Sequence, residues 1–317
     1  GSAIADTAAL ATLLLPMMRR QNYPDGSSAG LIASGGIIAP IIPPSMPMVI
    51  YGVTTNTSIS KLFLAGIVPG LMMASALVMV WRWVARSKQL SVAEKTTWPQ
   101  RRHALASSAW ALMMPVIIIG GLRMGFFTPT EAGAVGAAGA FVIALVRRRL
   151  TWRKLWNVLT ETGYVSVSVL FLIIAASLYS RMLALTGMPA GITTAITDMG
   201  LGPWGFLIAY LAIVIALGCI IDSVSIMLIM LPIVLPIATA FQMDLIWFGV
   251  LTVVAVEIGL LTPPFGVSVY TVKSALNDPS ITIRDIFAGT FPFVLAMVVV
   301  LAILAVFPGL STWLARM

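Results

Sequence analysis

The chain has 317 residues, of which 59% are hydrophobic and only 9% are charged, and its mean hydropathy is +1.01. A water-soluble globule needs more polar residues to cover its surface, so this composition indicates an integral membrane protein. The formal net charge of +8 does not point to a nucleic acid, because lysine and arginine lie mainly in short loops between apolar segments. A single cysteine excludes an internal disulfide bond, and a single histidine argues against a histidine-based metal site.

Apolar segments long enough to cross a bilayer recur along the chain, which favours an all-α bundle of membrane-spanning helices over a β-barrel. Residues 1–18 form a small-residue-rich apolar segment that is interrupted only by Asp6. Residues 27–53 are apolar but are interrupted at Pro43, Pro44 and Pro47, which predicts two half-length helices joined by a break inside the membrane. Continuous helices are then predicted at 62–81, 104–122, 132–146 and 156–180.

The second half of the chain contains an apolar stretch, residues 204–240, that is nearly twice as long as a span and has no charged turn outside the membrane. It predicts a re-entrant hairpin, and it follows an amphipathic segment at 187–202. A second broken helix is predicted at 245–276, interrupted at Pro263 and Pro264, and a last span at 286–307. Within the hairpin, the expected entering half, turn and leaving half are 204–217, 218–223 and 224–240.

Alternate threading of these segments places 15 of the 19 basic residues on one side of the membrane, which the positive-inside rule identifies as cytoplasmic. The cytoplasmic set is Arg19, Arg20, Arg82, Arg86, Lys88, Lys95, Arg101, Arg102, Arg147, Arg148, Arg149, Arg153, Lys154, Lys273 and Arg284. The opposite side keeps Lys61, Arg123, Arg181 and Arg316.

Three landmarks recur in the same order in the two halves of the chain. The spacing from Asp6 to Pro16 recurs from Asp222 to Pro232, the double proline at 43–44 recurs at 263–264, and the motif at 65–69 recurs at 288–292. The basic pair that follows the first hairpin has no counterpart after the second, so the two copies are expected to face opposite sides of the membrane. Inverted repeats with discontinuous helices are typical of secondary transporters.

The repeat predicts the organisation of the chain as one transmembrane domain with three parts. We expect a first repeat at 1–81, connecting spans at 82–186 and a second repeat at 187–317. The first repeat lacks the entering half of its hairpin, so further residues are expected before Gly1.

Each double proline predicts a binding site, because a proline lacks an amide donor and prevents the helical hydrogen bond of the carbonyl four residues earlier. The carbonyls of Ala39 and Pro40, and those of Gly259 and Leu260, are therefore expected to need a partner in the membrane. Such oxygens suit a dehydrated Na⁺, and nearby helix N-termini suit a carboxylate. The candidate Na⁺ ligands are Gly1, Ser2, Asp6, Ala39, Pro43, Ser45, Gly218, Asp222, Ser223, Gly259, Thr262 and Gly266, of which Ser2, Ser45, Ser223 and Thr262 are also candidate substrate ligands.

Plainer roles remain open for the acidic candidates. Asp6, Asp222 or Ser223 can instead cap the helix that starts beside it. Glu257 lies one turn before the second break, where it either supports the local backbone or takes part in ion or proton coupling, because a carboxylate is costly in lipid.

Four stretches resemble the large membrane subunit of tripartite ATP-independent periplasmic (TRAP) transporters, the DctM-like family. They are GSAIADTAAL at 1–10, IIPPSMPMVIYG at 41–52, FLAGIVPG at 63–70 and EIGLLTPPFGVSVY at 257–270. The resemblance covers essentially the whole chain, with an N-terminal part of the family's subunit absent. One departure is Ala39, where the family often has glycine and where the second copy has Gly259.

The resemblance implies Na⁺-coupled uptake of an organic anion, such as a dicarboxylate or sugar acid, across a bacterial inner membrane by an elevator-type movement. It implies two partners, a small four-helix membrane subunit (DctQ-like) and a periplasmic substrate-binding protein, and no cofactor besides the coupling Na⁺. The expected protein is a multi-pass transporter and not an enzyme.

Other functions fit the sequence less well. A stand-alone Na⁺-coupled carboxylate transporter of related fold is the main alternative, and uptake without a binding protein would distinguish it. An intramembrane aspartyl protease would pair Asp6 with Asp222, but neither residue follows the Gly-x-Gly pattern that we would look for. A channel is disfavoured because nothing indicates a ring of identical filter loops.

Overall fold

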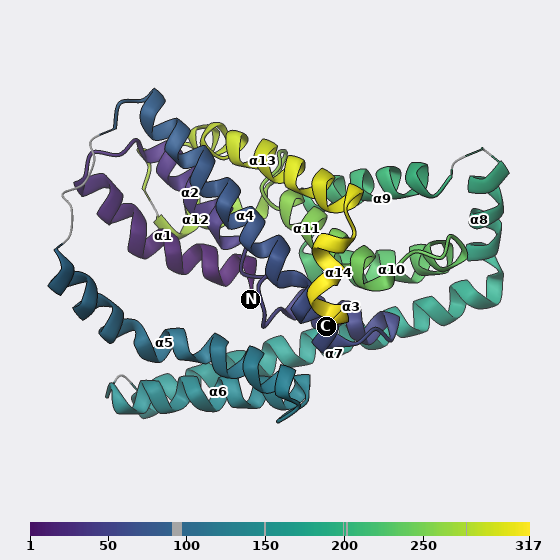
Figure 1. The fold of residues 1–317 in the computed structure, drawn as a ribbon, viewed down its shortest axis with the longest axis horizontal. Coiled ribbons are helices and arrows are strands. Elements are labelled where there is room, and N and C mark those ends of the chain that lie inside the picture. Colours follow the sequence, from purple (N-terminus) through teal and green to yellow (C-terminus); the bar gives the residue numbers. More distant parts are fainter. Residues whose placement is uncertain (91–96, 149, 199, 201, 277) are drawn as a thin grey trace. The chain divides into compact units, whose positions relative to one another are not determined.

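We describe the protein from a computed structural model, which describes residues 1–90, 97–148, 150–198, 200, 202–276 and 278–317. These residues form helices and connecting turns without strands (Figure 1), so the expected all-α fold is confirmed. Lys95, Arg149 and Asn277, which the sequence assigned to loops, lie outside the described residues. Within the described part, five helices are long and apolar enough to cross a membrane, or six spans if the bent α5 counts as one.

The chain divides into two compact units, Gly1–Val92 with Tyr179–Met317 and Ala93–Leu178. The larger unit contains the following helices: α1 (Ala3–Arg20), α2 (Asp25–Gly36), α3 (Met46–Thr55), α4 (Ile59–Ser87), α8 (Met188–Asp198), α9 (Pro203–Gly218), α10 (Ser223–Ala240), α11 (Leu245–Gly259), α12 (Val267–Leu276), α13 (Ile283–Val306) and α14 (Gly309–Arg316).

The smaller unit contains α5 (Trp98–Met124), α6 (Pro129–Val146) and most of α7 (Trp152–Thr186), the helix that continues into the larger unit. Helix α5 begins earlier than the predicted 104–122, so Arg101 to His103 lie in the helix and not in the loop before it. The side chain of Gln100 accepts a hydrogen bond from the amide of Thr97 at 2.9 Å, and Pro99 lies in the first turn. A capping box and a proline in the first turn both favour the start of a helix. Here they start α5 before the apolar segment begins.

The predicted pair of helices at 204–240 is confirmed as α9 and α10, which are joined by a short turn at 219–222. The 16 residues of α9 rise about 24 Å at 1.5 Å per residue, less than the roughly 30 Å of a bilayer core. Asp222 caps α10, so the chain turns back directly into the second helix of the hairpin.

Both predicted helix breaks are present, between α2 and α3 and between α11 and α12. In each break the Pro–Pro peptide bond is cis. Pro47 does not interrupt a helix as the sequence suggested, because it lies in the first turn of α3, where a missing amide donor costs nothing. Pro40 is the additional breaker, since the residue before a proline is disfavoured in the helical region, and α2 ends at Gly36.

The hairpin helices and the proline breaks of the two repeats correspond at a separation of 220 positions, which corrects one landmark. Ser2 caps α1 as Asp222 caps α10, and both helices have 18 residues. Pro16 therefore matches Pro236 and not Pro232, and Asp6 does not match Asp222. The sequence alignment was one helical turn out of register, because α10 contains two prolines four residues apart.

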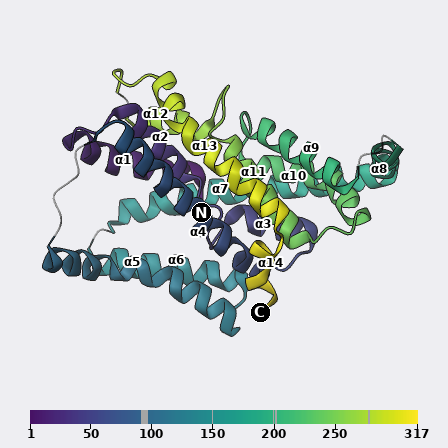
Figure 2. The same ribbon diagram turned by 45° about the horizontal axis from the view of Figure 1, so that its top comes forward.

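Contacts along α13 show that α2 and α11 run in opposite directions. Gly26, at the start of α2, packs against the backbone of Asp285 at the start of α13. Trp247, at the start of α11, donates its indole Nε1–H to the carbonyl of Leu304 near the end of α13, at 2.8 Å. Figures 1 and 2 both show α2 beside the first half of α13. The repeats are therefore inverted within the larger unit.

The packing of the repeats is also reciprocal. Helix α1 of the first repeat packs on α12 of the second, and α10 of the second repeat packs on α3 of the first. Each hairpin helix thus lies against the second half of the other repeat's broken helix, which brings the breaks and the hairpin turn to the centre of this unit.

Basic residues from the predicted cytoplasmic set meet at the end where α2 and α13 begin. Arg19 contacts the carboxylates of Asp25 at 2.8 Å and Asp278 at 2.6 Å, and these carboxylates raise the pKa of Arg19 further. The hydroxyl and amide of Ser280, followed by Arg19, lower the pKa of Asp278 to about 2. Lys88, at the end of α4, donates to the hydroxyl of Ser27 at 2.7 Å.

Helix α14 follows Pro308 and was not predicted. It packs on α4, and Arg316 contacts Asp244 at 2.8 Å, at the opposite end from the basic cluster. The predicted last span ends at Phe307, and an eight-residue segment shows too little periodicity to predict a helix after it.

Candidate functional site

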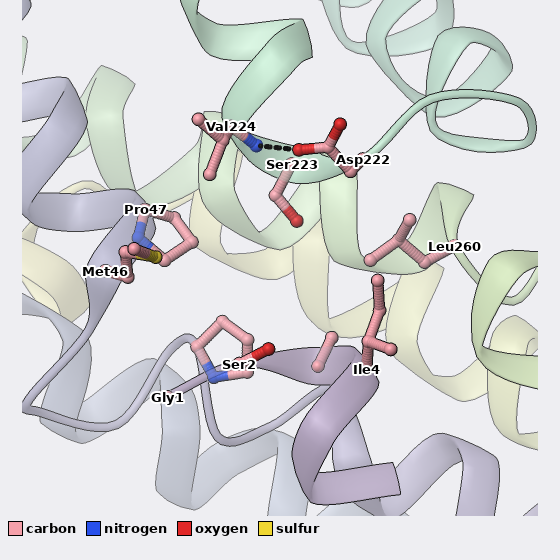
Figure 3. A pocket seen from close by; sticks show the side chains of 11 residues that line it. Gly1, Ser2, Ile4, Met46, Pro47, Asp222, Ser223, Val224 and Leu260 are labelled. Carbon is pink, nitrogen blue, oxygen red and sulfur yellow. Dashed lines mark hydrogen bonds between the residues drawn. The ribbon is translucent and has the colours of Figure 1, made fainter. Parts of the chain in front are cut away.

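A pocket lies where α1 and α10 begin and where both helix breaks approach them (Figure 3). About 410 Å³ of space is free of protein atoms here, and this volume includes space that is open to the exterior. The N-terminal ends of α1 and α10 therefore border the same pocket. The lining residues are Gly1, Ser2, Ala3, Ile4, Pro40, Met46, Pro47, Asp222, Ser223, Val224 and Leu260.

Asp222 borders the pocket, but its carboxylate caps α10. It accepts hydrogen bonds from the amides of Val224 at 3.0 Å and Ser225 at 3.2 Å, and from the Ser225 hydroxyl at 2.6 Å. Figure 3 shows the bond to Val224. The capping role that the sequence left open is therefore present, and it holds the carboxylate at the edge of the pocket.

Asp6 lies in the first turn of α1. Its Oδ2 accepts a hydrogen bond from the amide of Ser2 at 3.1 Å, while the Ser2 hydroxyl accepts from the amide of Ala5 at 3.4 Å. This exchange closes the N-terminus of α1 in the manner of a capping box. The recorded partners of Asp6 and Asp222 thus lie on different helices, so the described contacts do not form an aspartyl pair.

The hairpin turn and the second break are in direct contact. A Cβ atom added to Gly218 would lie 2.8 Å from the Cα of Gly259 and 2.8 Å from the carbonyl oxygen of Val256. The amide of Gly266 donates to the carbonyl of Cys219 at 3.1 Å. Glycine is required at this crossing because any side chain would separate the two backbones.

The first break has a similar neighbour in Gly1. A Cβ atom added to Gly1 would lie 2.8 Å from the carbonyl oxygen of Pro44 and 2.9 Å from that of Ala39. A hairpin-type segment therefore contacts a helix break in both repeats, although Ala39 stands where the second repeat has Gly259.

The carbonyls of Pro40, Gly259 and Leu260 lose their helical partners but accept other hydrogen bonds, which corrects the expectation that these three must find a partner outside the chain. Gly259 accepts from the amide of Thr262 at 2.9 Å, and Leu260 accepts from that of Ser268 at 3.1 Å. Pro40 accepts from the hydroxyl of Ser45. A carbonyl oxygen has two lone pairs, so each keeps one site for a further ligand.

Two predicted substrate ligands turn away from the pocket. The hydroxyl of Thr262 donates to the carbonyl of Ile258 at 2.9 Å. Ser45 is almost fully buried, and its hydroxyl accepts from the amide of Met48 at 3.2 Å. The other two predicted substrate ligands, Ser2 and Ser223, line the pocket. Pro43, which was predicted only as a Na⁺ ligand, is buried and does not line the pocket.

Glu257 is fully buried on α11, and its carboxyl reaches the hairpin. The hydroxyl of Ser223 donates to its Oε1 at 2.8 Å, whereas no partner is found for Oε2 within the described part of the chain. The sequence placed Glu257 beside the break but carried no signal of this partner, 34 residues away.

The apolar part of the lining was also missed. Ile4, Met46 and Leu260 line the pocket, and in the sequence nothing distinguishes their side chains from ordinary membrane-facing ones. The capping residues Ser2 and Asp222 mark where α1 and α10 begin, and residues next to a helix start lie near its cap. The caps are therefore the sequence signal from which this lining could have been predicted.

Comparison with known proteins relates this geometry to one family. Residues 1–310 match the family described as the tripartite ATP-independent periplasmic transporter, DctM component. The chain is 42% identical to the 2,3-diketo-L-gulonate TRAP transporter large permease protein of Escherichia coli, over 98% of the chain and 72% of that protein. It is 35% identical to the C4-dicarboxylate TRAP transporter large permease protein of Pseudomonas aeruginosa, over 98% and 72%. It is 33% identical to the sialic acid TRAP transporter large permease protein of Vibrio cholerae, over 100% and 74%.

Proposed function

This chain belongs to the DctM family of TRAP transporters, a family of transport proteins and not of enzymes, and from that membership we propose that it takes up an organic anion together with Na⁺. In this proposal it is the large permease subunit of a binding-protein-dependent system. The membership agrees with its several membrane-spanning helices.

The observation that carries the proposal is the contact between hairpin and break beside a pocket bordered by two helix N-termini. Gly218 and Gly259 bring backbone carbonyls together, and Ser223 adds a hydroxyl at the pocket. A hard cation prefers such oxygen ligands, and the partial positive charge of a helix N-terminus favours a carboxylate. The oxygen set therefore suits Na⁺, and the starts of α1 and α10 suit an acid.

The substrate class is proposed from the site and from the relatives together. The names of the three relatives given above specify diketogulonate, C4-dicarboxylates and sialic acid, each of which carries a carboxylate. We propose a small organic acid for this chain as well. No cofactor besides the coupling Na⁺ is needed for this role.

The partners and the movement are part of the same proposal. The subunit would work in a bacterial inner membrane with a small four-helix membrane subunit and a periplasmic substrate-binding protein. The hairpin and the two broken helices would move together as the elevator, since reciprocal contacts join α1 to α12 and α10 to α3.

The test is uptake into liposomes that contain the full-length subunit with its small subunit. A radiolabelled organic acid is supplied on its binding protein, with an inward Na⁺ gradient or with choline in place of Na⁺. We expect uptake only with Na⁺ and only with the binding protein. Equal uptake in choline would contradict Na⁺ coupling, and Na⁺-driven uptake without the binding protein would instead favour a stand-alone carboxylate transporter.

A further inference from the structure

Ser223 and Glu257 form a side-chain contact between the hairpin and the first half of the broken helix. Ser223 is the first residue of α10 and lines the pocket. Glu257 lies two residues before the end of α11, and none of its surface is exposed. The contact therefore joins a pocket residue to a group that cannot itself reach the pocket.

This contact determines which part of the Ser223 hydroxyl faces the pocket. A serine hydroxyl has one proton to donate and two lone pairs to accept with. The proton is directed at Oε1 of Glu257, 2.8 Å away. The lone pairs are left for the pocket, where they can bind a cation but cannot donate to a substrate carboxylate.

The equivalent positions of the first repeat, 220 residues earlier, hold Ala3 and Ile37. Both are buried, with exposed fractions of 5% and 0%. Apolar residues thus fill the same place in the other repeat, so packing alone does not require a serine and a glutamate. A buried carboxyl with one unpartnered oxygen costs free energy, which indicates that Glu257 serves a purpose other than stability.

We propose that Glu257 is a positioning residue that orients the Ser223 hydroxyl as a ligand for the coupling Na⁺. This inference rests on the proposed function, because it assumes that Na⁺ binds beside the hairpin turn. It also makes the two repeats unequal, since only the second has an oriented hydroxyl at this place. Groups that hydrogen-bond to metal ligands commonly change metal affinity by about 10–100-fold when they are removed.

The experiment measures Na⁺ binding directly, by the rise in melting temperature of the purified full-length subunit as NaCl replaces choline chloride. Bound Na⁺ stabilises the folded state, so the midpoint of the rise reports affinity. We expect Ser223→Ala and Glu257→Leu each to raise the half-saturating Na⁺ concentration by roughly tenfold. Glu257→Gln should remain close to wild type, because its amide oxygen can still accept from Ser223.

Two comparisons separate positioning from a general loss of stability. The double variant Ser223→Ala with Glu257→Leu should bind Na⁺ no more weakly than Ser223→Ala alone, because Glu257 acts through Ser223. Thr252→Val is the matched control, since Thr252 is a buried hydroxyl on the same helix that bonds to Tyr210 at 3.0 Å. It should lower the melting temperature without changing the Na⁺ midpoint.

Different results would contradict the positioning role of Glu257 and the proposed Na⁺-coupled uptake. A wild-type Na⁺ midpoint in Ser223→Ala, or an additive loss in the double variant, would overturn the positioning role while uptake stayed Na⁺-dependent. Absence of any Na⁺ response in the wild-type subunit, together with Na⁺-independent uptake, would instead refute the proposed function. If Glu257→Leu does not fold, Ser223→Ala can still overturn the proposal, because a wild-type Na⁺ midpoint would show that the hydroxyl does not bind Na⁺.

Discussion

Replacement of Gly259 by alanine tests the crossing of the hairpin and the second break. The added Cβ would lie 2.6 Å from the Cα of Gly218 and 2.6 Å from the carbonyl oxygen of Ile215. All of these atoms belong to backbone, so no flexible side chain can move aside. Helices α9 and α11 must therefore separate where they now touch.

The size of the effect follows from the geometry. Nonbonded carbon atoms prefer a separation of about 3.5–4.0 Å, so the two backbones must move apart by about 1 Å. Overpacking of this kind costs about 1–3 kcal/mol in the free energy of unfolding. Since 1 kcal/mol corresponds to about 2–4 °C for chains of 150–250 residues, the melting temperature should fall by several degrees.

Thermal unfolding of the full-length subunit in detergent, followed by circular dichroism, measures this change. Gly133→Ala is the control, because a Cβ atom at Gly133 has no neighbour within 4 Å and alanine favours the helix α6. We expect the control to match or slightly exceed wild type. A Gly259→Ala variant as stable as the control would refute the close approach.

Three further changes have defined outcomes. Ser45→Ala removes the cap of α3, and its melting temperature should fall by an amount corresponding to about 1 kcal/mol in the free energy of unfolding; a change in transport without lost stability would instead indicate substrate contact. Trp247→Phe leaves the carbonyl of Leu304 without its donor and should cost about 1–3 kcal/mol in a denaturant titration, whereas Trp83→Phe, at a side chain 65% exposed, should cost almost nothing. The pKa of Asp278 is about 2 in the folded state, below the roughly 3.9 of an unfolded aspartate, so its contribution is present above pH 4 and is lost as the pH falls through 2. Acid titration of Asp278→Asn should therefore show a smaller loss of stability over this range than wild type, and an identical curve would contradict the assignment.

Much of the candidate site could be predicted from local sequence rules, and the wrong predictions also concern local hydrogen bonds. Proline and capping rules located both breaks and the hairpin turn, and they included Ser2, Asp222 and Ser223, which line the pocket. The same rules could not tell that Ser45 and Thr262 turn their hydroxyls to nearby backbone, because a hydroxyl can rotate to several partners. They also assumed that the carbonyls at the breaks have no partner in the chain, whereas the amides of Thr262 and Ser268 donate to the carbonyls of Gly259 and Leu260.

The sequence by itself determined the membrane class, the helix breaks, the hairpin and the existence of a repeat, because these depend on apolar length and on the missing amide of proline. Only the tertiary structure decided the register of the repeat, since two prolines in α10 fit the pattern equally well. It also decided that Gly218 meets Gly259 and that Ser223 donates to Glu257. Such contacts join residues tens of positions apart, and their geometry depends on how α9, α10 and α11 pack and not on any local preference.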